Sequence, residues 1–140
     1  MLTANPSLWE TRAAAITIAG DALADEVRRR APECVSRLGA STNNVKPLHH
    51  SRTFGLPGRH DEALVLSVMF TFSCGPMHLH CDLMQEDGPI LSDLPLRDLG
   101  VNPTDAVIDS AVADVVAFIP PLVGIIVAYL QAQQSETTRG

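Results

Sequence analysis

The chain has 140 residues, of which 46% are hydrophobic and 19% charged, and its net charge is −6. This composition is typical of one folded domain with its own core and argues against a disordered chain. An acidic chain repels phosphate backbones and anionic lipid, so we expect no nucleic acid among its partners. Its cysteines form no disulfide framework and its N-terminus has no signal-peptide pattern, which predicts a cytoplasmic protein.

The first predicted element is a long N-terminal helix that ends at Arg30. Apolar or small residues recur along it at steps of four and three, on one face: Trp9, Ala13, Ile16, Gly20, Leu23 and Val27. The basic run 28–30 falls in the last turn, where cations stabilise a helix C-terminus, and Pro32 discourages continuation. We interpret this run as a helix end rather than a binding patch, and Trp9 as an anchor between helix and sheet.

The middle of the chain predicts a three-stranded antiparallel β-meander after a long loop at 42–61. That loop is rich in turn residues, although a short strand near 45–54 is an alternative. Leucine, valine or phenylalanine occupies every second position over 64–72, and apolar residues alternate with polar ones over 77–83, which predicts two strands joined at Gly75 and Pro76. Pairing Ser73 with His78, and Phe70 with Cys81, puts both apolar sets on one side. A turn at 86–88 leads into a third strand over 89–94.

The C-terminal part predicts a kinked helical pair packed on one face of the sheet. Thr104 is a plausible N-cap, and Pro120 with Pro121 must break the helix that follows it. The second helix begins near Leu122, and 134–140 read as a frayed polar tail. The predicted fold is therefore a single α+β domain over 1–140.

The helix after the double proline is apolar on nearly every side, so something must cover it. We expect either burial within the monomer or contact with another protein or a second copy, as a homodimer. The candidate contact residues are Leu122, Ile125, Ile126 and Tyr129. A membrane span over 115–130 is a further alternative, although it would need ~20 apolar residues without a break.

Two imidazoles and a carboxylate alternate along the second predicted strand, at His78, His80 and Asp82. Side chains at every second position share one strand face, and these types can bind a divalent metal such as zinc. Further ligands could come from His49, His50, His60 or Asp61. The opposing interpretation is a solvated sheet face, because the residues predicted to lie beside them are small and polar.

No phosphate-binding, dinucleotide-binding or catalytic motif occurs in the sequence, so no enzyme activity or cofactor is predicted. We expect a small cytoplasmic accessory protein that acts by binding another protein through an apolar helical surface, as chaperone-like, immunity-like or regulatory proteins do. The alternatives are a metal-binding protein or metallohydrolase using His78, His80 and Asp82, and a membrane-associated protein using 115–130.

Overall fold

The computed structural model describes residues 6–41, 46–72 and 75–139, and for residues 6, 7, 60 and 137–139 it describes the backbone alone. The predicted pairing of Ser73 and the side chain of His60 therefore lie outside the described residues, as does Cys74.

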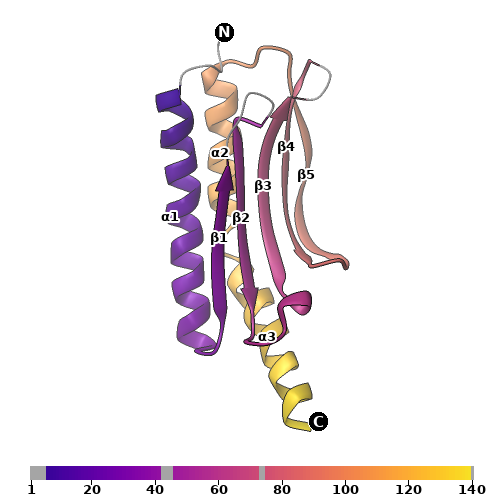
Figure 1. Cartoon of the computed structure of the whole chain (residues 1–140). Helices are drawn as coiled ribbons and strands as arrows, with labels where there is room; N and C mark the ends of the chain where they lie inside the picture. The colour runs from indigo at the N-terminus through magenta and orange to yellow at the C-terminus, as the bar shows by residue number, and fades with distance from the viewer. Residues whose placement is uncertain (1–5, 42–45, 73–74, 140) are drawn as a thin grey trace.

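The described residues form one antiparallel sheet of five strands and three helices (Figure 1). In chain order these are α1 (Pro6–Arg30), β1 (Val35–Ser41), β2 (Leu48–Gly55), β3 (Leu64–Phe72), β4 (Met77–Gln85), β5 (Ile90–Gly100), α2 (Asp105–Phe118) and α3 (Leu122–Arg139). Strand order in the sheet follows chain order, so each strand pairs with the next. The α+β class and the meander topology are confirmed, whereas the predicted three strands are corrected to five.

The two additional strands lie before the predicted meander. β2 corresponds to the alternative strand near 45–54 and replaces part of the loop predicted over 42–61, and β1 precedes it. The buried side of β2 carries His50 and Arg52 between Leu48 and Phe54, so it shows no apolar alternation. β1 is an edge strand whose residues are mostly exposed on both faces, so it has no apolar alternation either.

The hairpin of β3 and β4 has the predicted faces but a different register. Phe72 pairs with Met77, Phe70 with Leu79, and Val68 with Cys81, so β4 is shifted by two residues against the predicted pairing. A two-residue shift keeps each side chain on its face, because the period of a strand is two. The alternation determines the face, and the turn alone determines the register.

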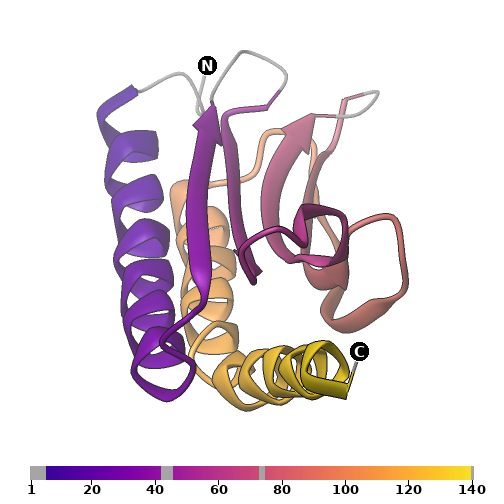
Figure 2. The same ribbon diagram turned by 60° about the horizontal axis from the view of Figure 1, so that its bottom comes forward.

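All three helices lie on one side of the sheet, as Figures 1 and 2 show. The predicted face of α1 is buried there, and the ring of Trp9 meets the ring of Phe70 on β3 edge to face, with 5.6 Å between centroids. This confirms Trp9 as an anchor between helix and sheet. The core fills the space between helices and sheet with residues such as Ile16, Leu66 and Ile108, each fully buried.

The C-terminal helical pair breaks at the two prolines, as predicted. Thr104 caps α2, since its Oγ1 accepts a hydrogen bond from the backbone N–H of Val107 at 3.3 Å. α3 continues to Arg139, where a frayed tail was predicted. Among the described helices none is by itself long and apolar enough to cross a membrane; α2 and α3 together have the length and composition, but are bent by 42° at their break.

Candidate functional site

The side of the sheet opposite the helices has no fully buried residue on β2, β3 or β4 apart from Gly55. We call this surface the open face; on β2 to β4 it comprises His49, Ser51, Thr53, Val65, Ser67, Met69, Thr71, His78, His80, Asp82 and Met84. Antiparallel sheets commonly pack one face on a core and leave the other in water. The face that carries the predicted metal residues is therefore the accessible one.

An apolar band crosses the open face near one end of the strands. Val65 on β3 pairs directly with Met84 on β4, and Met84 pairs with Ile90 on β5, so the three side chains lie in one row. Ile90 is 56% exposed, and Val65 and Met84 are only partly buried. The next row along the strands is polar and contains Ser67, Asp82 and Asp93.

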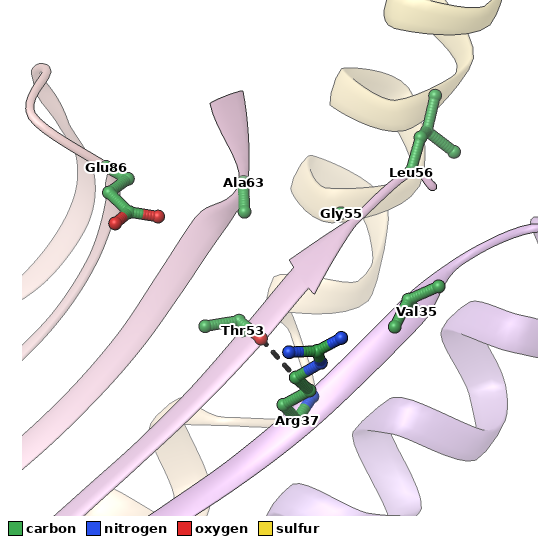
Figure 3. Close-up of a pocket in the computed structure, with 7 residues that line it drawn as sticks. All are labelled: Val35, Arg37, Thr53, Gly55, Leu56, Ala63 and Glu86. Atoms are coloured by element: carbon green, nitrogen blue, oxygen red, sulfur yellow. Dashed lines mark hydrogen bonds between the residues drawn. The ribbon is translucent and has the colours of Figure 1, made fainter. Parts of the chain in front are cut away.

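A hollow of about 230 Å³ adjoins the apolar band on β1 and β2 (Figure 3). Its lining comprises Val35, Arg37, Thr53, Gly55, Leu56, Ala63 and Glu86. Gly55 and Ala63 meet closely in this lining, since a Cβ added at Gly55 would lie 3.1 Å from the Cβ of Ala63. The backbone N–H of Arg37 donates to Thr53 Oγ1 at 3.3 Å, which ties the edge strand to its neighbour. The hollow therefore combines apolar walls with two side chains of opposite charge, Arg37 and Glu86.

The predicted metal residues share the open face but have different neighbours. His78 pairs with Asp98 on β5, with 3.8 Å between Nε2 and Oδ2, whereas His80 is exposed and pairs with Met69 on β3. Alternate residues on a strand are about 6.5–7 Å apart. Within residues 6–41, 46–72 and 75–139, no three His, Cys, Asp or Glu side chains are grouped closely enough to hold a metal ion.

Asp82 is a partly buried carboxylate on this face. Partial burial raises its pKa, Asp93 directly opposite on β5 raises it further, and His80 opposes the shift. Its Oδ1 is inaccessible to solvent and has no hydrogen-bond partner among the residues that the structure describes. Asp82 therefore has a weaker tendency to ionise than an ordinary surface aspartate.

The predicted helical contact residues divide between the core and the surface. Leu122 and Ile126 are buried in the monomer's own core, and Ile125 is 38% exposed. Tyr129 is partly buried, and its hydroxyl donates to the backbone carbonyl of Glu62 at 2.6 Å. A partner that contacts this part of α3 would meet Ile125 and the accessible part of Tyr129.

A polar cluster that the sequence did not indicate lies between α1 and β2. His50 is 3% exposed and Arg52 5%, and the Arg52 guanidinium forms an ion pair with Asp21 of α1. Gly20 of α1 faces both side chains without a Cβ of its own. Burial, together with the nearby charge of Arg52, lowers the pKa of His50 to about 4, so the imidazole is neutral near pH 7.

No family model, no curated protein and no solved structure matches this chain.

Proposed function

We propose that this chain is a small accessory protein that acts by binding another protein, with the open face of its sheet as the contact surface. The apolar band of Val65, Met84 and Ile90 is the observation that carries this proposal. These side chains would be covered by a partner, as the apolar centre of an interface is. The metal-binding and membrane-associated alternatives remain predictions, and no feature of the described residues favours either over protein binding.

The surroundings of the band support this assignment. Interfaces place polar residues around an apolar centre, and here the polar row of Ser67, Asp82 and Asp93 borders the band on one side. The hollow continues the band toward the edge strand β1, so a side chain of the partner has a recess to enter. Met84 at the centre of the band is a flexible and polarisable side chain that can adapt to such a contact.

Site-specific photo-crosslinking in the native cells tests the proposal. A photoreactive amino acid at Met84 should give a discrete adduct with one other protein. The same residue at Ala22, an exposed position of α1 on the helix side, is the matched control and should give none. A second label at Thr71, on the open face but away from the band, should react weakly.

Substitution of Met84, at the centre of the band, provides a second test of the proposed contact surface. Met84→Lys should abolish the adduct from a label at Thr53, whereas Ala22→Lys should leave it unchanged. Circular dichroism of both variants establishes that they fold. Absence of any adduct from Met84 and Thr53 in a soluble, folded protein would overturn the proposal, as would an adduct that forms equally from Ala22.

A further inference from the structure

Among the described residues no strand pairs with the outer edge of β1, because β1 is the first strand in the sheet order. All seven residues pair in unbroken register with β2, so the strand is regular and presents a straight edge. Helix α1 packs over β2 and leaves β1 uncovered, since Leu38, on the helix side of the sheet, is still 47% exposed. An exposed, regular edge with an apolar side chain is a template for another strand.

The opposite edge of the sheet differs from β1 in features that prevent strand addition. β5 contains Pro95, which has no N–H to donate, and its pairing with β4 is interrupted at three places. Natural proteins protect edges with such prolines and bulges. β1 has neither, and its only charged residue is Arg37. The unprotected edge is therefore the one to which a partner strand can be added.

The sequence of β1 is complementary to itself. In antiparallel pairing about a two-fold axis perpendicular to the sheet, opposite residues must share a face. The axis therefore lies midway between one residue and its own copy in the second chain. An axis at Leu38 places Leu38 opposite its own copy and Arg37 opposite Gly39 of the second chain. Ser36 then faces Ala40, and Val35 faces Ser41, so every residue of the strand has a partner.

Other registers with the same symmetry pair fewer residues or oppose like charges. An axis at Arg37 puts the two guanidinium groups directly opposite each other, which is unfavourable. An axis at Gly39 leaves Val35 and Ser36 unpaired and separates the two exposed Leu38 side chains. The register centred on Leu38 alone pairs all seven residues, joins the apolar side chains and gives each Arg37 the space above a glycine.

We propose that two copies of this chain join edge to edge through β1, in antiparallel pairing centred on Leu38, to form one continuous sheet with all helices on the same side. The open faces of the two copies then form a single surface. A contact of one strand pair is smaller than a standard interface, so we expect a weak dimer with a Kd in about the micromolar range or above. The dimer uses a different surface from the apolar band and does not depend on the proposed function.

Sedimentation velocity of the purified full chain over a range of concentrations tests the proposal. The wild type should sediment as a monomer–dimer equilibrium. Leu38→Lys places two ammonium groups opposite each other on the axis and should weaken dimerisation at least about tenfold. Leu96→Lys is the matched control, because Leu96 is 62% exposed on the other edge strand, and it should leave the equilibrium unchanged.

Thiol cross-linking tests the register, in a Cys74→Ser background in which Cys34 and Cys81 are buried. Leu38→Cys should cross-link efficiently between copies with a short bifunctional maleimide, because directly opposite residues have Cβ atoms about 5 Å apart. Leu96→Cys should not. A strict monomer at about 0.5 mM, or equal cross-linking at both positions, overturns the proposal. The adduct at Met84 in cells is a separate readout, so the failure of one proposal does not imply failure of the other.

Discussion

Gly20 of α1 lies directly against His50 of β2, such that a Cβ added to the glycine would be 3.3 Å from the imidazole Nε2 and 3.2 Å from the Nε of Arg52. The helix and the sheet approach this closely because the glycine has no side chain. Both polar side chains are buried beneath the helix, and within the described part of the chain neither of these nitrogens has a hydrogen-bond partner. The contact of α1 with β2 therefore has no room for an additional atom.

Gly20→Ala should destabilise the protein by about 1 kcal/mol. Alanine gains about 1 kcal/mol in helix propensity, but the added methyl group must displace buried side chains, at a cost of about 1–3 kcal/mol. Gly124→Ala is the control, because Gly124 is exposed on α3 and a Cβ there meets nothing within 4 Å. It should stabilise the protein by up to about 1 kcal/mol. Urea unfolding measures both, and equal stabilisation by the two variants would refute the close contact.

The stability of the protein should fall as the pH drops from about 6.5 to about 4, because of His50. Above this range the imidazole is neutral in both folded and unfolded chains. Within it, the unfolded chain binds a proton that the folded chain does not, because burial lowers the pKa of His50 from 6.5 to about 4. Below it both forms are protonated and the loss is complete. The upper bound of this contribution is about 3 kcal/mol.

Urea unfolding at a series of pH values checks this. His50→Gln should reduce the loss of stability between pH 6.5 and 4, whatever its effect at pH 7. His49→Gln is the matched control, since His49 is the adjacent residue on the open face and contributes least to lowering the pKa of His50, so this variant should keep nearly all of the wild-type dependence. If His50→Gln and the wild type show the same dependence, another group is responsible.

Arg12→Ala should cost about 2–3 kcal/mol of unfolding free energy. Arg12 is 3% exposed, lies 4.8 Å from the ring of Trp9 and donates to Asp109 at 2.8 Å and to Asp105 at 3.0 Å. The substitution removes both charge-assisted hydrogen bonds and the packing of the long side chain between α1 and α2.

Two further variants separate these contributions. Arg12→Met retains most of the packing and should lose less than Arg12→Ala. Arg28→Ala removes a surface ion pair with Asp25 and should change stability by no more than about 0.5 kcal/mol. Thermal and urea unfolding of the three variants would contradict this assignment if Arg28→Ala and Arg12→Ala had equal effects.

Metal analysis decides the predicted role of His78, His80 and Asp82. Because each pairs with a different neighbour and successive side chains are about 6.5–7 Å apart, we expect no stoichiometric zinc in protein purified without a histidine tag. Calorimetric titration with zinc should give the same weak response for the wild type and His80→Ala. One equivalent of zinc in the wild type, absent from His80→Ala, would establish the metal site.

The elements that follow a simple apolar period could be predicted from sequence, and those that depart from it could not. β3 and β4 carry apolar residues at every second position, and α1 repeats its apolar residues at helical spacing, so their buried faces were correct. β2 was indicated only as an alternative strand near 45–54, because His50 and Arg52 occupy its buried face, where α1 supplies a glycine and an aspartate that no local pattern reveals. β5 was predicted only in its first half, since Pro95 and the irregular pairing obscure the rest.

The candidate site was predictable only in part, because it depends on register. The alternation of His78, His80 and Asp82 correctly placed them together on one face. The apolar band, however, requires Val65, Met84 and Ile90 to align across three strands, and a two-residue error in register removes that alignment. The hollow next to it depends on β1, which the sequence did not indicate.

The meander has a consequence for how the chain folds. Because every strand pairs with its neighbour in sequence, the sheet consists of local hairpins, and such contacts form early and quickly. The link from Arg12 to Asp109 joins residues 97 positions apart and requires both ends of the chain to be present. We therefore expect the sheet to form first and α1 and α2 to dock together late, so that substitutions at Arg12 accelerate unfolding and leave the folding rate nearly unchanged.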